Sequence, residues 1–255
     1  MRCKSKRCLA RRRAGFYIGR EVAADSPEAA LPLHGPNVWP PAALLPGWRD
    51  TMERYSAACR ALGMRLTRLL ALALGLEPGF FDAPGRFDAP QFFLRLLRYS
   101  AEASAPTAGV FGAGAHTDYG MLTLLATDDC PGLQIQPRVG GVDGPWRDVA
   151  PRKGAFIVNL GDMLERWTNG VFLSTRHRVV NVAGRQRLSM PFFFGARIVS
   201  EAAMLRSSDR SAAPCSRRRA ELRLRRGMPS AVLLRRETCS IRARQGGGIP
   251  AQPLR

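Results

Sequence analysis

The hydrophobic and polar positions divide the chain into a helical region and a longer region of strands. Apolar residues recur at three- and four-residue steps over 48–74, with charged residues between them, as in an amphipathic helix. Gly75 follows at the place where a helix needs to stop. The repeating positions are Trp48, Met52, Tyr55, Cys59, Leu62, Leu66 and Leu69. The sequence therefore predicts one long helix after a Pro-, Ala- and Gly-rich loop over 23–47.

Beyond residue 90 the pattern changes to short apolar runs bounded by Gly, Pro or Asp, which are typical of β-strands. The predicted strands cover 92–99, 121–126, 132–136, 146–149, 155–160, 177–182 and 187–194. One short helix interrupts them, because Asp162 and Glu165 fit a capping box and Gly170 fits a helix C-terminus. Asn159 is interpreted as a turn residue, so it and Asp162 receive structural roles. Many short strands with few helices favour a β-sandwich or a jelly roll.

The net charge of +19 is concentrated at the two ends of the sequence. Residues 1–20 contribute +8 and residues 198–255 contribute +9, whereas residues 21–197 contribute only +2. The strand pattern stops after residue 197 and arginine becomes frequent, so we expect a disordered tail there. The expected divisions are a basic segment over 1–13, a domain over 14–197 with its jelly-roll core at about 92–197, and the basic tail over 198–255.

Charge and cysteine content also bear on partners and location. Arginine runs at 217–219 and 225–226 would attract nucleic acid or anionic membrane, but no aromatic residues alternate with them for base stacking. We therefore expect a monomer without a nucleic-acid or membrane partner. Six cysteines without a CxxC pair predict free thiols in a reducing compartment such as the cytoplasm. The alternative is an organelle, to which the Arg-rich N-terminus would direct the protein.

Two polar residues, His116 and Asp118, directly precede an apolar run, although both are costly to bury. Positions i and i+2 of a strand point to the same face, so we expect these side chains to converge. His177 begins another predicted strand. Two imidazoles and one carboxylate leave three positions of a metal open, which suits non-haem Fe(II) better than tetrahedral zinc. His34 is expected to pack within its loop.

A second polar pair, Arg187 and Ser189, occupies one face of an otherwise apolar predicted strand. A buried arginine is costly unless a carboxylate neutralises it, and the planar guanidinium fork suits a carboxylate. No acidic residue of this strand can do so. A small anionic ligand such as 2-oxoglutarate would satisfy both side chains.

The ordered motifs HTD, STRHRVVN and RLS, with GDMLERWTNG between them, resemble the iron(II)/2-oxoglutarate-dependent dioxygenases of the isopenicillin N synthase-like superfamily. The resemblance covers about residues 14–197 and implies a mainly β fold with flanking helices, the double-stranded β-helix or jelly roll. It implies three iron ligands, which are His116, Asp118 and His177. It also implies three residues that bind 2-oxoglutarate, which are Arg187, Ser189 and Tyr99.

The resemblance further implies an oxidoreductase that uses Fe(II), 2-oxoglutarate and O2. Such an enzyme hydroxylates, desaturates or cyclises a small organic substrate and releases succinate and CO2. One alternative is an oxidase of the isopenicillin N synthase type, in which Arg187 and Ser189 would hold a substrate carboxylate. The other is a truncated, impaired binding module, because family members usually carry more structure before GFYIGREV and a closing helix after the last strand. A jelly roll incomplete at its N-terminus is then expected.

Overall fold

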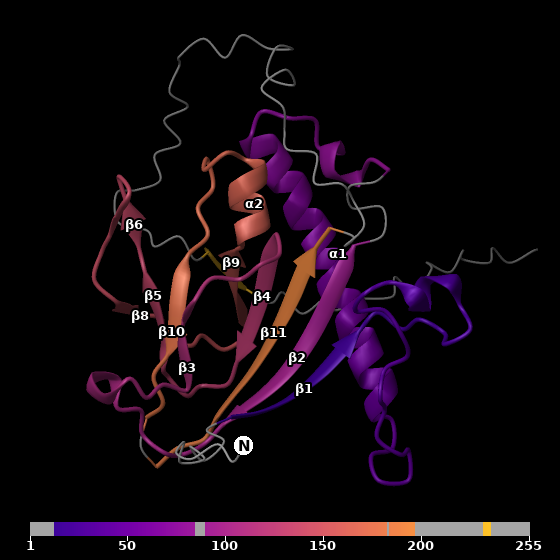
Figure 1. Ribbon diagram of the computed structural model, residues 1–255, viewed down its shortest axis with the longest axis horizontal. Helices are drawn as coiled ribbons and strands as arrows, with labels where there is room; N and C mark the ends of the chain where they lie inside the picture. Colours follow the sequence, from indigo (N-terminus) through magenta and orange to yellow (C-terminus); the bar gives the residue numbers. More distant parts are fainter. Residues whose placement is uncertain (1–12, 85–89, 183, 197–231, 236–255) are drawn as a thin grey trace, which may run out of the picture.

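The computed structural model describes residues 13–84, 90–182, 184–196 and 232–235. Two antiparallel sheets face each other, and a long helix covers the outer face of the larger one (Figure 1). In spatial order the larger sheet contains β1 (Arg13–Gly19), β2 (Gln91–Tyr99), β11 (Arg187–Gly195), β4 (Leu122–Thr127), β9 (Ala155–Leu160) and β12 (Val232–Arg235). The smaller sheet contains β3 (Ala113–His116), β10 (Arg176–Val179), β5 (Leu133–Gln136) and β8 (Arg147–Asp148).

The remaining elements are short, apart from the long helix α1 (Trp48–Ala73). They are the hairpin strands β6 (Arg138–Val139) and β7 (Val142–Asp143), the helix α2 (Asp162–Trp167), and the 3-10 turns η1 (Pro27–Ala30), η2 (Phe80–Asp82) and η3 (Pro106–Ala108). This is a jelly-roll architecture, as the sequence predicted. Among the described residues, no helix has both the length and the apolar character needed to cross a bilayer.

The helix α1 has nearly its predicted bounds, and every predicted apolar position except Leu69 is buried or packs against the core. Its buried positions are Ser56, Cys59, Gly63, Thr67 and Ala71, which are mostly small residues spaced by three or four. An ideal Cβ at position 63 would lie 3.1 Å from the ring of Phe194 on β11. Small side chains therefore let the helix approach the sheet closely. Leu69, which was predicted to face the core, is 59% exposed.

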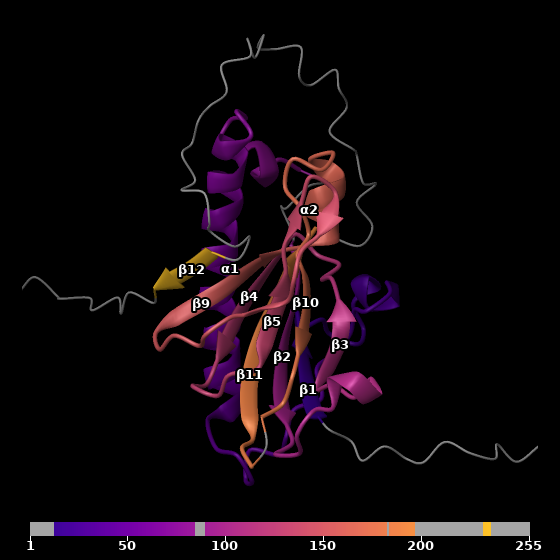
Figure 2. The ribbon, with the colours of Figure 1, turned by 90° about the vertical axis from the view of Figure 1, so that its left-hand side faces the viewer.

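The strands β2 and β11 separate two cores by alternation of their side chains. Even-numbered residues such as Leu94 and Phe192 pack towards α1. Odd-numbered residues such as Leu97 and Tyr99 pack between the two sheets, where they meet Val179 of β10. Figures 1 and 2 show α1 on one side of the larger sheet and the smaller sheet on the other. The odd-numbered residues of β2 and β11 therefore line the space between the two sheets.

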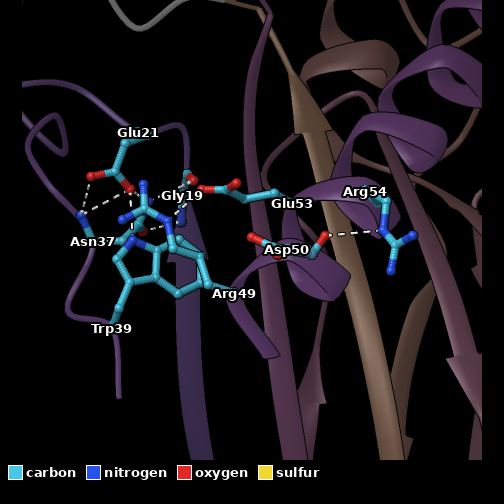
Figure 3. A network of polar contacts seen from close by, with 8 residues as sticks. All are labelled: Gly19, Glu21, Asn37, Trp39, Arg49, Asp50, Glu53 and Arg54. Atoms are coloured by element: carbon cyan, nitrogen blue, oxygen red, sulfur yellow. Dashed lines mark hydrogen bonds and ion pairs between the residues drawn. The ribbon is translucent and has the colours of Figure 1, made fainter. Parts of the chain in front are cut away.

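A polar network fastens the loop between β1 and α1 to the sheet (Figure 3). The Glu21 carboxylate accepts hydrogen bonds from Asn37 Nδ2 at 2.7 Å and from Trp39 Nε1 at 3.0 Å. Asn37 in turn accepts a 2.8 Å bond from the backbone N–H of Gly19. Slight burial opposes ionisation, but these hydrogen bonds outweigh it and hold the pKa of Glu21 below its ordinary value. Arg49 of α1 lies 5.0 Å from the Trp39 ring centroid, which links the loop to the helix.

Several strands were not predicted. β1, β3, β6 and β7 were all missed, because their residues show no clear apolar alternation. The tail over 198–255 was expected to be disordered, but residues 232–235 form β12, which pairs with β9. That expectation is wrong for these four residues, and the rest of the tail lies outside the described residues, as does the basic segment over 1–12.

Candidate metal centre

Two histidines face each other across neighbouring strands of the smaller sheet. His116 ends β3, His177 lies in β10, and the two are register partners with ring centroids 4.3 Å apart. His116 Nδ1 lies 2.8 Å from the Gly114 carbonyl oxygen, and His177 Nδ1 lies 3.0 Å from that of Thr175. If each Nδ1 carries the proton and donates it, both Nε2 atoms keep a free lone pair. Backbone bonds of this kind orient metal-binding imidazoles.

Asp118 completes the group, although not in the predicted manner. β3 ends at His116, so Asp118 lies in the turn before β4 and not on one strand with His116. Its Oδ1 is 3.6 Å from His177 Nε2, and its buried Oδ2 has no hydrogen-bond partner among the described residues. One ligand atom from each of the three side chains lies within 4.8 Å of the others. The unpartnered carboxylate oxygen and the two Nε2 atoms fit a divalent metal that prefers nitrogen and oxygen donors.

The turn that carries Asp118 is held by the start of α2. The backbone N–H of Asp162 donates to the Asp118 carbonyl at 2.8 Å, and the Thr117 hydroxyl donates to Asp162 Oδ2 at 3.0 Å. Gly161 is packed tightly there, because an ideal Cβ on it would lie 2.8 Å from the Asp118 carbonyl oxygen. The predicted capping box is wrong: Gly161 is the N-cap, and Glu165 accepts a bond from Ser174 N–H. Asp162 therefore contacts the residue between two candidate ligands.

Electrostatics favour neutral imidazole at this place. Desolvation and the nearby His177 ring hold the pKa of His116 below its ordinary value. A neutral histidine offers a lone pair to a metal, whereas a protonated one does not. His34, in contrast, lies half-buried in its loop, where its Nδ1 is 2.8 Å from the Pro32 carbonyl oxygen. It does not belong to the three-residue group.

The residues predicted to bind 2-oxoglutarate lie together on the larger sheet. Arg187 is 3% exposed and Ser189 is 2% exposed, two residues apart on β11, and Tyr99 is the register partner of Arg187 on β2. The Arg187 guanidinium lies 5.3 Å from the Tyr99 ring centroid. Its Nε has no hydrogen-bond partner within the described part of the chain. Burial holds the pKa of Arg187 below its ordinary value, although the interactions with Tyr99 and with the Asp128 carboxylate oppose this shift in part.

One cavity of about 60 Å³ between the sheets is lined by both groups. It brings His116, Asp118 and His177 together with the polar residues of β2 and β11. A ligand pocket usually measures about 300–1,000 Å³, which is larger than this cavity. An organic ligand must therefore also occupy space outside the cavity, at its opening. A larger, open hollow of about 640 Å³ lies behind Thr117, on the side of α2 and the β6–β7 hairpin.

Sequence reasoning missed four polar residues of the cavity, which are Arg13, Arg95, Thr123 and Asn159. Asn159, interpreted as a turn residue, lies in β9, lines the cavity and is 2% exposed. Its Oδ1 and the Oγ1 of its register partner Thr123 are buried without partners among the described residues. Arg95 of β2 also lines the cavity. The sequence did contain an indication of Arg95, because residues 95, 97 and 99 alternate onto the same face of the predicted strand as Tyr99.

The fold and the donor set together define a class: a jelly-roll protein with a two-histidine, one-carboxylate site that leaves metal positions open. Residues 93–196 match the family model of the 2OG-Fe(II) oxygenase superfamily. The chain belongs to this superfamily, and it is 37% identical over 179 residues to an Aspergillus niger protein named as a 2-oxoglutarate-dependent dioxygenase. The recognition made from the HTD, STRHRVVN and RLS motifs is thereby confirmed.

Relatives and solved structures agree with this assignment. Azadirone synthase of Melia azedarach is 43% identical over 166 residues, which are 65% of this chain and 50% of that protein. A 2-oxoglutarate-Fe(II) type oxidoreductase of Emericella nidulans is 39% identical over 186 residues, 71% of this chain and 51% of that protein. A full-length Neurospora crassa protein in complex with alpha-KG superposes with a TM-score of 0.60 at 32% identity, covering 73% of this chain and 55% of that one. The chain spans about half the length of the curated relatives it matches.

Proposed function

We propose that this chain is a non-haem Fe(II) and 2-oxoglutarate-dependent oxygenase that oxidises a small organic substrate. The observation that carries the proposal is the shared cavity, in which the His116, Asp118 and His177 group lies with the buried Arg187, whose Nε has no hydrogen-bond partner among the described residues. His116, Asp118 and His177 would hold the iron. When bound, iron and 2-oxoglutarate supply O2 activation coupled to release of succinate and CO2.

The chain's own residues would bind and orient the reactants. Arg187 would form a charge-assisted pair with the distal carboxylate of 2-oxoglutarate, supported by the hydroxyl groups of Ser189 and Tyr99. That contact would satisfy the buried Nε that now lacks a partner. Burial of Arg187 and Tyr99 would keep water away from this end of the cavity. The two Nδ1 contacts to backbone carbonyls would fix both imidazoles towards the metal.

We also propose the class of substrate, the cellular location and the oligomeric state. Structural relatives hold different molecules: one complex of the Neurospora crassa protein contains thymine, and one of JOX2 contains JA. We propose a small organic substrate without naming it, hydroxylation as the reaction, and a monomer as the working form. Cys130 is a free, buried thiol, as expected in the reducing cytoplasm that we propose as the location.

The test is anaerobic addition of Fe(II) and 2-oxoglutarate to the purified chain, followed by a search for the visible absorbance band of the chelated complex. We expect the band in the unmodified protein and in Arg185→Ala, because Arg185 is exposed and paired with Asp129. Arg187→Ala should weaken it. A folded protein without any band would contradict the proposal and favour an impaired binding module. Binding of metal without binding of 2-oxoglutarate would favour the alternative, an oxidase of the isopenicillin N synthase type that does not use this cosubstrate.

A further inference from the structure

Arg95 is a half-buried cation for which the proposed function has no use. It lies on the interior face of β2 and lines the cavity that contains the metal group. Its Nε is buried and has no hydrogen-bond partner, and no carboxylate of the described residues pairs with it. Its guanidinium carbon lies 4.6 Å from the ring centroid of Tyr17 on β1. A buried charged donor without an acceptor is costly, so the site is incomplete as it stands.

The neighbours of Arg95 form a site around it. Tyr17 is its register partner and covers one side of the guanidinium. Gly15, two residues earlier on the same face of β1, leaves room, because an ideal Cβ there would lie 3.5 Å from Arg95 Nε and 3.0 Å from Leu97 Cδ2. Pro191 and Phe193 supply an apolar wall from β11. A cation beside an apolar wall suits a small molecule with one charged end.

The charges around the cavity indicate the sign of that end. Three arginines, Arg13, Arg95 and Arg187, and one carboxylate, Asp118, line it. A divalent metal and a dianionic 2-oxoglutarate would cancel each other, and Asp118 would offset Arg187. The positive charges of Arg13 and Arg95 would then remain. A cavity with this excess attracts a further anion and disfavours a cation.

We propose that the cavity takes a small substrate bearing a carboxylate, which Arg95 binds at the end of the cavity near β1. This inference rests on the proposed function, because it assigns Arg187 to 2-oxoglutarate and leaves Arg95 for the substrate. Arg95 is then a specificity-determining residue. A neutral molecule of the same shape would leave the guanidinium unpaired and bind more weakly.

The experiment compares two probes of one shape, benzoate and benzamide. The full chain is loaded with Zn(II) and saturating 2-oxoglutarate, without iron, so that no turnover occurs, and each dissociation constant is measured by ligand-observed NMR. The variants are Arg95→Met, Arg95→Lys and the control Arg98→Met. Arg98 is exposed on the outer face of the same strand, so its replacement removes an equal charge outside the cavity. Binding of 2-oxoglutarate is titrated separately for each protein.

We expect benzoate to bind about tenfold more tightly than benzamide to the unmodified protein and to Arg98→Met. Arg95→Met should remove this preference and leave 2-oxoglutarate affinity within about twofold, while Arg95→Lys should keep part of it. The inference is overturned if benzoate has no advantage, if Arg95→Met retains it, or if benzoate acts by displacing 2-oxoglutarate. If Arg95→Met lowers the affinity for 2-oxoglutarate as much as the affinity for benzoate, Arg95 would be assigned to the cosubstrate instead. Failure of every protein to bind 2-oxoglutarate would overturn the proposed function and this inference together.

Discussion

At the scale of single residues, the buried polar atoms around the cavity indicate most clearly which side chains bind ligands. Proteins pair nearly all the polar groups that they bury, so each buried atom without a partner calls for an explanation. Asp118 Oδ2, Arg187 Nε and Arg95 Nε are three such atoms, from residues that line one cavity. Each lowers the stability of the protein without ligands, and each would gain a partner when metal, cosubstrate and substrate bind. Stability and ligand binding are therefore coupled at this site.

Asp118→Asn tests that coupling. The substitution removes a buried charge but preserves shape, so the metal-free protein should unfold at the same temperature or higher. Metal affinity should fall by more than the roughly 10- to 100-fold that loss of an outer-sphere partner costs, because a ligand itself is changed. Calorimetric titration with Co(II) and thermal unfolding of the metal-free form measure the two effects. Asp148→Asn, at an exposed carboxylate, is the control, and unaltered Co(II) affinity in Asp118→Asn would exclude this carboxylate as a ligand.

Single residues were predictable where a polar side chain interrupts an apolar strand. The pairs His116 with Asp118 and Arg187 with Ser189 stood out for this reason. Arg95 did not, since an arginine in a half-buried strand usually extends to solvent. Only the alternation that it shares with Tyr99 indicated its direction, and the register of β2 with β1 then places it beside Tyr17.

Among the elements, α1 illustrates how a helix is fitted to a sheet. The apolar period predicted its length and most of its core-facing positions, but the most deeply buried positions are small residues around Gly63. Gly63→Leu should destabilise the fold by about 1–3 kcal/mol, because the Phe194 ring leaves no room for the side chain. Ala61→Leu, on the exposed side of the same helix, is the matched control. Chemical denaturation compares them, and equal stabilities would mean that the helix is packed less closely than described.

The short helix α2 acts on the ligand turn through Asp162. Asp162→Ala removes the acceptor of the Thr117 hydroxyl and should weaken metal binding about tenfold, as expected for an outer-sphere partner. Asp162→Asn keeps an acceptor oxygen and should restore most of the affinity. Metal titration of the two variants, with thermal unfolding as a check on folding, separates positioning from general damage. Identical losses in both variants would show that the hydrogen bond to Thr117 is unimportant.

Strands were predictable when one of their faces was continuously apolar. β2, β4, β9 and β11 have such faces and were found almost to the residue. β3 consists of Ala-Gly-Ala-His and contributes mainly backbone pairing, so no side-chain pattern marks it. Tertiary pairing, not local preference, makes it a strand.

At the scale of the whole molecule, the larger sheet begins at β1 and ends at β12 within the described residues. β12 comes from the basic region near the end of the sequence and pairs with β9 (Figure 2). An unpaired strand edge promotes association between molecules. Only one of two consecutive backbone N–H groups of an antiparallel edge strand points to its neighbour, so the double variant Leu233→Pro/Leu234→Pro removes one donor from this pairing without altering the net charge. We expect increased light scattering and larger species on size-exclusion chromatography, and a monodisperse variant would show that β9 needs no such cover.

The alternation along β2 and β11 has a consequence for how such a protein can change over generations. Odd positions face the reactants and even positions face the helix, so the two sets of side chains answer to different selective pressures. A substitution at 95 or 193 can alter which molecule is accepted without disturbing the packing against α1. Single substitutions at these positions can therefore change substrate specificity while the protein still folds. The same parity offers an engineer a short set of codons to randomise.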